Sequence, residues 1–312
     1  MFKRNSIRQL GGGYGLGFHW TTWNVTQEGI NIPFEEQVNN FDVDKFVRSA
    51  KNLGAKHVLI TNCHALQYTP APNPYIDALI SNRTCKRDVI GELAEALRKE
   101  DMKFICYYHH GCDGPQDPDW WNVCGGADYF SDIFYKNIIN IISYIGERYG
   151  DKIDAFWFDA GYGYWRRGYV PWKELSEAAR AGNPDRLITY NPGVKNYGSY
   201  TEYQDYYAGE VNYRCLECVP KEETVNGMDW YSFMALHKWT ENPDSMDCAQ
   251  WGIDNTCWNK KDWDKADPKD LAEYVKKFNA IGSTVTFNML CYADGSILQD
   301  DADTINEMRK FL

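Results

Sequence analysis

Apolar, strand-like runs alternate with helix-like segments along almost the whole chain. Most of these runs lack alternating polar residues, as is typical of parallel strands covered on both faces. The expected strands cover residues 16–20, 56–62, 103–108, 155–158, 186–191, 205–210, 246–251 and 283–288. The expected helices cover residues 42–53, 89–98, 130–149, 171–181, 269–280 and 301–311. Strand followed by helix, about eight times over, predicts an α/β protein with a (β/α)8 TIM barrel.

An open, doubly wound sheet is the alternative arrangement of such elements. It usually carries a glycine-rich phosphate loop after its first strand, and residues 19–23 (His-Trp-Thr-Thr-Trp) are not such a loop. A length of 312 residues is ordinary for one barrel. We therefore expect a single catalytic barrel domain over residues 1–312.

Composition and charge limit the classes of partner that this protein can bind. The formal net charge of −11 argues against nucleic acid, which needs clustered Lys and Arg. No apolar run reaches the roughly 18 residues of a membrane span, and Met1 to Leu10 lacks the apolar region of a signal peptide. We expect no nucleic-acid or membrane partner. The compartment stays open between the cytoplasm and, if a leader was removed, the periplasm or exterior, and the oligomeric state is not predicted.

Cysteine spacing bears on metal binding. Of the ten cysteines, only Cys215 and Cys218 form a C-x-x-C pair, and no second pair or paired histidines follow at zinc-site spacing. We therefore expect no structural metal and no cofactor.

Polar and aromatic residues lie at the ends of the expected strands, where barrel enzymes place their active sites. Two of them, Asp159 and Glu210, are carboxylic acids on different strands, which suits glycoside hydrolysis. A separation of about 5 Å would mean double displacement, and roughly 6.5–9.5 Å would mean inversion. The other candidates, all predicted to contact substrate, are His19, Trp20, Asn62, His64, Tyr108, His109, Trp157 and Asn191.

Five segments resemble motifs of the α-L-fucosidases, glycoside hydrolase family 29. They are Gly17–Trp20, similar to a Phe-Ile-His-Trp-Gly strand; Leu59–His64, similar to Leu-Thr-x-Lys-His-His; Phe156–Asp159, matching Trp-x-Asp; Asp205–Glu210, similar to Asp-Phe-x-Thr-x-Glu; and Asn288–Ile297, similar to Asn-Ile-x-Pro-x-x-Asp-Gly-x-Ile. The resemblance covers nearly the whole chain.

The resemblance implies a retaining exo-glycosidase that acts on α-L-fucosides or a related deoxy or modified glycoside. Asp159 would be the nucleophile and Glu210 the general acid/base, and His19, His64, Tyr108 and Trp157 would line the sugar subsite. Many family members append a C-terminal β-sandwich, which we do not expect within these residues.

Two departures from the family pattern concern the choice of sugar. The paired histidines become Cys63-His64, and an Asn-Asp-Arg sequence becomes Asn191-Pro192-Gly193, which removes an arginine that contacts the sugar. Because a site that hydrogen-bonds particular hydroxyls rejects sugars lacking them, altered donors imply an altered sugar or linkage.

Two other functions stay open on sequence alone. The lost arginine and the many aromatic residues allow a carbohydrate-binding barrel without turnover. A metal-dependent hydrolase using His64, His109, His110 and Asp159 is a weaker alternative, since no His-x-His strand motif supports it.

Overall fold

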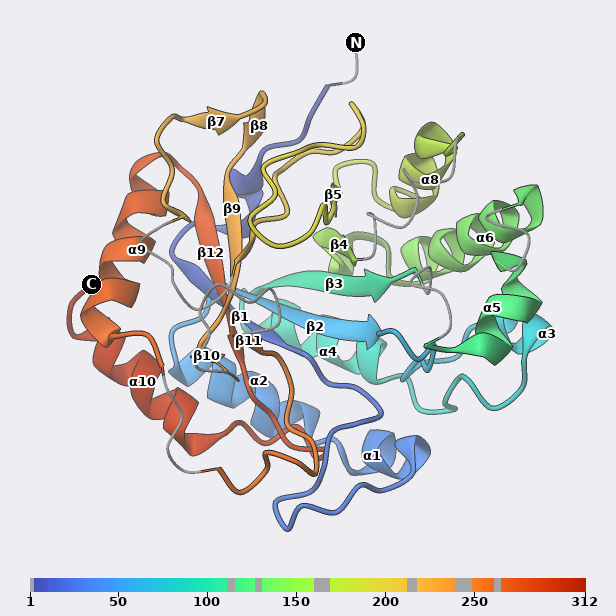
Figure 1. Cartoon of the computed structure of the whole chain (residues 1–312), viewed down its shortest axis with the longest axis horizontal. Helices are drawn as coiled ribbons and strands as arrows, with labels where there is room; N and C mark the ends of the chain where they lie inside the picture. Colours follow the sequence, from blue (N-terminus) through green and yellow to red (C-terminus); the bar gives the residue numbers. More distant parts are fainter. Residues whose placement is uncertain are drawn as a thin grey trace.

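The computed structural model describes residues 3–110, 116–126, 131–159, 169–211, 218–238, 249–260 and 265–312. Its central feature is an eight-stranded sheet with the strand order β5-β4-β3-β2-β1-β12-β9-β6, in which every neighbouring pair is parallel. The sheet is curled, and the helices pack around its outside, α9 and α10 on one side and α5 and α6 on the other (Figure 1). This arrangement is the (β/α)8 barrel expected from the sequence.

The strands of the barrel are β1 (Tyr14–Phe18), β2 (His57–Cys63), β3 (Lys103–His109), β4 (Ala155–Asp159), β5 (Leu187–Tyr190), β6 (Glu210–Val211), β9 (Tyr231–Ala235) and β12 (Thr284–Met289). Two small antiparallel pairs are β7 (Thr224–Val225) with β8 (Met228–Asp229) and β10 (His237–Lys238) with β11 (Ala249–Gln250). The helices are α1 (Phe34–Asn40), α2 (Val43–Asn52), α3 (Pro74–Leu79), α4 (Val89–Lys99), α5 (Pro118–Cys124), α6 (Asp132–Tyr149), α8 (Trp172–Ala179), α9 (Pro268–Ala280) and α10 (Gln299–Arg309), with short 3-10 turns η1 (Ile7–Leu10) and η3 (Gly150–Lys152).

Helix α2 shows how local sequence sets these boundaries. The side chain of Asp42 accepts a hydrogen bond of 2.9 Å from the backbone N–H of Lys45, which satisfies a free donor of the first turn. Buried residues recur at helical spacing along one face, and Gly54 then takes a left-handed φ of 82° just beyond the end. The helix predicted over residues 42–53 is confirmed.

The barrel strands are buried on both faces, and in β2, β3, β4, β5 and β9 apolar residues of the two faces fall mostly into two different hydrophobic clusters. The inner cluster fills the barrel and is closed at one end by Ile7 and Leu10 of η1. The outer cluster joins the strands to the helices and includes Phe156 and Phe158 of β4. Members of the inner cluster on the strands include Leu59, Ile105, Tyr107, Ala155, Trp157, Leu187, Tyr231 and Phe233. Alternate residues of one strand therefore point to opposite sides, and only the inner set can reach a site inside the barrel.

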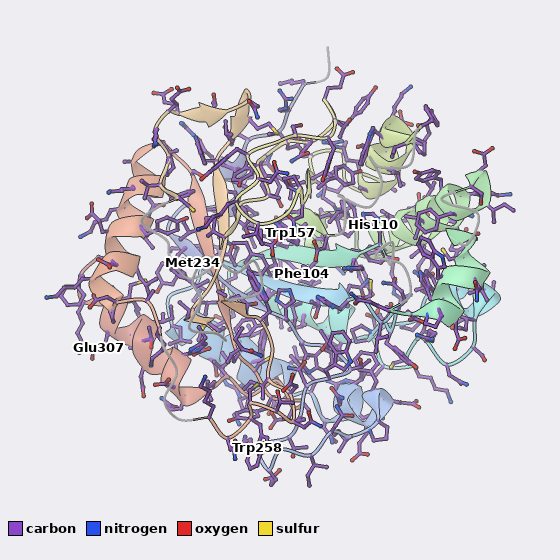
Figure 2. All side chains as sticks on the ribbon, viewed as in Figure 1. Phe104, His110, Trp157, Met234, Trp258 and Glu307 are labelled. Carbon is purple, nitrogen blue, oxygen red and sulfur yellow. The ribbon has the colours of Figure 1, made fainter. Side chains whose placement is uncertain are left out.

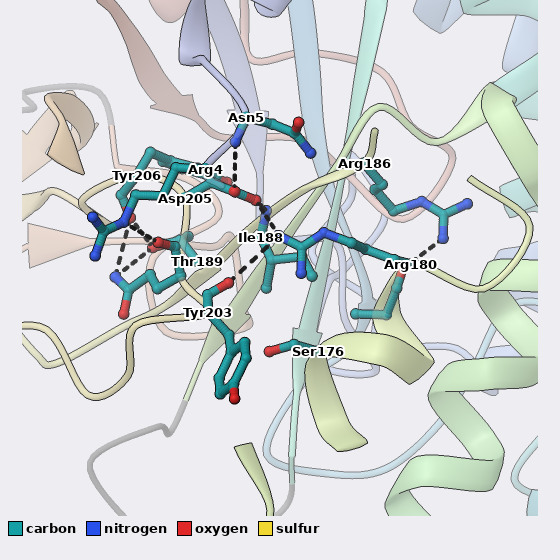
Figure 3. Close-up of polar contacts among 12 residues, drawn as sticks. Arg4, Asn5, Ser176, Arg180, Arg186, Ile188, Thr189, Tyr203, Asp205 and Tyr206 are labelled. Carbon is teal, nitrogen blue, oxygen red and sulfur yellow. Dashed lines mark hydrogen bonds and ion pairs between the residues drawn. The ribbon is translucent and has the colours of Figure 1, made fainter. Parts of the chain in front are cut away.

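Asp205 closes the barrel between β5 and β6, which are not adjacent in the sheet. Its backbone N–H donates to the carbonyl of Ile188 in β5, and its carboxylate accepts from the N–H of Ile188, both at 2.8 Å. The same carboxylate accepts from the N–H of Asn5 at 2.9 Å and from Arg180 at 2.7 Å (Figure 3). This buried side chain therefore takes up part of the hydrogen bonding that an adjoining strand would supply, five residues before Glu210.

The seventh strand differs from the sequence prediction. The barrel uses β9, whereas residues 246–248 of the predicted strand lie outside the described residues and the pair Ala249–Gln250 belongs to the small β10–β11 ladder. The sixth strand is also shorter than predicted, because only the end of segment 205–210 pairs as a strand. Helices α1, α3 and α5 were not predicted. Among the helices of the described residues, none combines the length and the apolar character needed to cross a membrane.

Candidate active site

The side-chain amide of Asn191 bridges the two carboxylic acids predicted to be catalytic. Asp159 ends β4, and Asn191 directly follows β5, the strand beside it. Glu210 begins β6. Nδ2 of Asn191 lies 2.9 Å from Oδ1 of Asp159 and 2.7 Å from Oε2 of Glu210. Because one nitrogen contacts both oxygens, these two oxygens are at most about 5.6 Å apart, the sum of the two contacts.

The surroundings shift the pKa values of the two acids in opposite directions. Burial favours the neutral form of Asp159, but the electrostatic influence of His109 and hydrogen bonds from Tyr107 and Asn191 outweigh it and lower the pKa of Asp159 below its usual value. Burial, and then the charge of Asp159, raise the pKa of Glu210 to about 8, against the hydrogen bond from Asn191. At neutral pH Asp159 is ionised and Glu210 holds a proton, a division of roles that acid–nucleophile pairs need.

Tyr107 supports Asp159 from the neighbouring strand β3. Its hydroxyl donates a hydrogen bond to Oδ2 of Asp159, the oxygen that Asn191 does not contact. Its ring stacks on Trp157, with centroids 5.2 Å apart, and on the other side lies nearly parallel to the ring of His64 at 5.7 Å. The register of β3 and β4 pairs Tyr107 with Trp157 and His109 with Asp159, which brings these side chains together inside the barrel.

His19 lies at the same end of the barrel, just beyond β1, and its protonation pattern follows from Asn288. Nδ2 of Asn288 donates to the carbonyl of Trp251 at 2.8 Å, so its Oδ1 faces Nδ1 of His19 at 2.8 Å. Nδ1 therefore carries the hydrogen and donates it. Burial lowers the pKa of His19, so the ring is neutral and Nε2 is left as an acceptor for a ligand hydroxyl.

His64, His109 and Trp157 complete the set of predicted residues that the structure places at this site. The ring of His64 lies 5.3 Å from that of His109 and 5.5 Å from that of His19. Trp157 lies near the centre of the barrel (Figure 2) and donates from Nε1 to the carbonyl of Ala208, two residues before Glu210. Burial and the neighbouring His109 and His19 lower the pKa of His64 well below its usual value.

Two predicted substrate contacts, Trp20 and Tyr108, lie on the outer face of the barrel, and those predictions are corrected. Trp20 packs against Phe34 and Phe41 and donates to the carbonyl of Ala293. Tyr108 is fully buried in the outer cluster, because adjacent residues of β3 point to opposite sides.

Asn62 makes no hydrogen bond to either carboxylate within the described residues. It is the extra residue at an irregularity of β2, where Thr61 pairs with Tyr107 and Cys63 pairs with Tyr108. The side chain is buried, and within the described residues its amide makes no hydrogen bond. The irregularity shifts the inward positions by one residue, so that His64 faces the site and Cys63 joins the outer cluster.

One residue of the metal-site alternative, His110, lies apart from the other three. His110 lies beyond the tip of β3 (Figure 2) and packs on the outer side against Phe158 at 4.9 Å, away from His109 and Asp159. Within the described ranges, no three His, Cys, Asp or Glu side chains are grouped closely enough to hold a metal ion.

Comparison with known proteins places the chain in a family. The α-L-fucosidase family model matches residues 14–312. The chain belongs to the α-L-fucosidase family. As a member of this family it is a glycoside hydrolase, so the non-catalytic barrel considered from sequence is set aside. No curated protein matches the sequence.

Solved structures of two α-L-fucosidases and of one family 107 enzyme share the fold. An α-L-fucosidase of family 29 from Bacteroides thetaiotaomicron, a trapped covalent intermediate, is 18% identical with a TM-score of 0.68 over 99% of this chain and 76% of that one. The α-L-fucosidase AlfC from Lactobacillus casei, with fucose bound, is 19% identical with a TM-score of 0.65 over 97% and 96%. An endo-fucoidan hydrolase of family 107 is 16% identical with a TM-score of 0.70 over 99% and 54%.

Sequence reasoning missed three parts of this fucosidase-family site. Tyr107 directly precedes Tyr108, which was the predicted contact. Because both residues are tyrosines, the sequence does not show which of the two faces the inside of the barrel. Asn288 stood in a recognised motif without an assigned role. Trp251, whose ring lies 5.2 Å from His19, sits in a segment predicted as a strand.

Proposed function

We propose that this protein is a retaining exo-glycosidase that hydrolyses α-L-fucosides, or glycosides of a related deoxy or modified sugar, by double displacement. The observation that carries the proposal is the shared contact of Asn191 with Asp159 and Glu210. Carboxyl groups about 5–5.5 Å apart are typical of retaining enzymes, whereas inverting enzymes need roughly 6.5–9.5 Å to hold a water. The upper limit of about 5.6 Å between the bridged oxygens supports the first arrangement.

In the first step, a carboxylate oxygen of Asp159 attacks the anomeric carbon and the bond to the leaving oxygen breaks. Glu210 gives its proton to that oxygen, and a glycosyl ester of Asp159 forms. In the second step, Glu210, now a carboxylate, takes a proton from water while the water oxygen attacks the same carbon. The ester bond breaks, Asp159 is released as a carboxylate, and two inversions give net retention.

The environment of Glu210 suits the acid role. A pKa of about 8 keeps the acid protonated at neutral pH yet allows it to release the proton when the leaving group departs. Asn191 donates to Oε2, which leaves Oε1 to carry the proton toward the leaving group.

The fucosyl substrate is supported by the family and by the related structures. AlfC holds α-L-fucose, and the Bacteroides enzyme was trapped with 2-fluoro-fucosyl fluoride. In this chain, Nε2 of His19 is positioned to accept a hydroxyl hydrogen, and His64 lies beside it. Cys63 faces the outer cluster and supplies no donor to the sugar, and Pro192-Gly193 supplies no arginine, so a related or modified sugar is included in the proposal.

A stereochemical assay tests this proposal. An aryl α-L-fucoside is incubated with the protein, and the anomeric signals of the first-formed sugar are followed by NMR. We expect the α anomer to appear first, and Asp159→Ala and Glu210→Gln to abolish turnover, with azide partly restoring product formation in the former. Initial release of the β anomer, or full activity in either variant, would contradict the mechanism.

A further inference from the structure

A groove of about 1150 Å³ lies between the two loops that follow β1 and β2. The first loop contributes Trp23, Phe34 and Glu35, and the second contributes Tyr68, Asp77 and Lys86. This volume exceeds the roughly 300–1,000 Å³ of a typical small-ligand pocket, so the groove can hold a group as large as a sugar ring. Because both loops follow the carboxyl ends of their strands, the groove opens on the same end of the barrel as Asp159.

Trp23 joins this groove to the active site. Its indole is 44% exposed and lines the groove, and it contacts the ring of His64 edge-on, with centroids 5.6 Å apart. His64 stacks on Tyr107, and Tyr107 donates to Asp159. Two aromatic rings, those of His64 and Tyr107, therefore lie between Trp23 and the carboxylate.

The groove lies on the side of the site opposite Glu210. Oδ1 of Asp159 faces Asn191 and Glu210, whereas Oδ2 faces Tyr107, and beyond it His64 and Trp23. Strand order leads to the same conclusion. In the order β5-β4-β3-β2-β1-β12-β9-β6, strands β1 and β2 lie in the middle and β6 lies at one end, so in the curled sheet β1 and β2 face β6 across the barrel. The anomeric carbon must sit between the two acids and the leaving group must contact Glu210, so the groove adjoins the far hydroxyls of the bound sugar.

Both walls of the groove are held in place by buried contacts. Asn24 fixes the first loop, accepting from the N–H of Thr21 at 2.7 Å and donating to the carbonyl of Cys291 at 2.8 Å. In the second loop, Arg83 makes a two-pronged ion pair with Asp117, at 2.6 and 3.0 Å, and its guanidinium lies 4.4 Å from the ring centre of Tyr68. A preformed surface loses little entropy when it binds a ligand.

We propose that this groove is a glycone-side subsite, which binds a neutral sugar attached to a ring hydroxyl of the fucosyl unit. The exposed face of Trp23 supplies a stacking surface, and the exposed polar residues supply hydrogen bonds. Arg83 is already neutralised by Asp117, which leaves Glu35, Asp77 and Lys86 as the other charged lining residues, an excess of negative charge that disfavours sulfated sugars. The inference rests on the proposed function. It extends the released product from a single sugar to a fucosyl unit that carries a second sugar.

Three kinds of substrate test the subsite. They are a simple aryl α-L-fucoside, aryl disaccharide glycosides in which a second neutral sugar is attached to each fucosyl hydroxyl in turn, and a fucoside with a disaccharide leaving group. We expect the native enzyme to cleave at least one of the aryl disaccharide glycosides about as efficiently as the simple one. Trp23→Ala should lower kcat/KM for that substrate about 10-fold and change the other two by less than about two-fold.

Tyr75→Ala is the matched control, because Tyr75 is also 44% exposed and does not line the groove. It should leave all three rates unchanged. Failure of the native enzyme to cleave any aryl disaccharide glycoside, while it cleaves the simple aryl fucoside, would overturn the subsite. Equal losses on all three substrates in Trp23→Ala would instead make Trp23 a support for His64, and a loss confined to the third substrate would make the groove a leaving-group site.

A binding measurement separates this inference from the proposed function. The ligands are the methyl glycosides of the same neutral disaccharides and their counterparts with a sulfate on the second sugar. In Asp159→Ala, calorimetry should detect binding of a neutral methyl disaccharide, and adding Trp23→Ala should weaken its affinity about 10-fold. Such a loss of affinity would support the subsite even if the native enzyme did not cleave the simple aryl fucoside. Lack of cleavage would contradict the proposed function and not the subsite. Equal affinity in the two variants, or tighter binding of the sulfated disaccharide, would overturn the assignment of the groove.

Discussion

Nδ2 of Asn191 lies 2.7 Å from Oε2 of Glu210 and donates a hydrogen bond to it. The same nitrogen lies 2.9 Å from Oδ1 of Asp159. This amide holds the two acids close together and lowers the pKa of each, so that Asp159 stays ionised and the rise at Glu210 is moderated.

Removal of this amide should therefore disturb both acids. We expect Asn191→Ala to lower kcat/KM roughly 10- to 100-fold, since hydrogen bonds to charged groups contribute about 1.5–3 kcal/mol. Asn196→Ala is the control, because Asn196 lies in the same loop and its side chain, within the described residues, bonds to main-chain atoms of Pro192 and Gly198 and to neither acid. Steady-state kinetics on an aryl fucoside measure both, and an equal loss in the two variants would point to the loop rather than to the bridge.

The pH dependence of kcat/KM should be bell-shaped with a wide plateau. Asp159 must be ionised, and because its pKa is lowered, activity falls only as the pH drops below the usual range of an aspartate. Glu210 must be protonated, so activity falls again as the pH rises through about 8.

Carbon-labelled glutamate would report the titration of Glu210 directly by NMR. Because the charge of Asp159 contributes to the raised pKa, we expect Asp159→Asn to lower the pKa of Glu210. An unchanged value would show that burial alone accounts for the shift.

Tyr107 and Tyr108 offer a paired test of which face of β3 lines the site. Tyr107→Phe removes a donor to Asp159, so we expect kcat/KM to fall roughly 10- to 100-fold and the acidic limb to move to higher pH. Tyr108→Phe, in the outer cluster, should leave that limb in place. A shift of the limb in Tyr108→Phe alone would reverse the assignment.

The fold was largely predictable from the sequence because the strands of this barrel are continuous apolar runs. The run at residues 155–158 and the one at 103–108 predict β4 and β3 within one residue of their observed ends. The seventh strand was missed because its residues, Tyr231–Ala235, follow the short β7–β8 hairpin, not a helix, in the described structure. Without the expected helix before it, the strand does not repeat the pattern used for the others.

The candidate site was only partly predictable, for the same physical reason. In a strand buried on both faces, no polar alternation shows which side chains point inward, so Tyr108 was chosen where Tyr107 faces Asp159. At β2 an irregularity between Thr61 and Cys63 shifts the inward positions, which sequence spacing cannot reveal. The bridge from Asn191 depends on neighbouring strand ends and emerges only from the fold.

Asp205 should matter for stability more than for chemistry. Its buried carboxylate accepts hydrogen bonds from Asn5, Ile188 and Arg180, and Asp205→Ala leaves these donors unpaired. We expect a loss of about 3–5 kcal/mol in the free energy of unfolding, measured in urea. Asp185→Ala, at an exposed position in the preceding loop, should change it by less than about 0.5 kcal/mol. A small loss in Asp205→Ala would mean that other contacts close the barrel.

The identity of the nucleophile is the central claim, and covalent trapping tests it most directly. A 2-fluoro-fucosyl fluoride slows the second step, so the Glu210→Gln variant should accumulate a glycosyl ester that peptide mass spectrometry can locate. The account predicts a single modification, on Asp159. A modification on any other residue, or no modification in a native enzyme that hydrolyses fucosides, would contradict it.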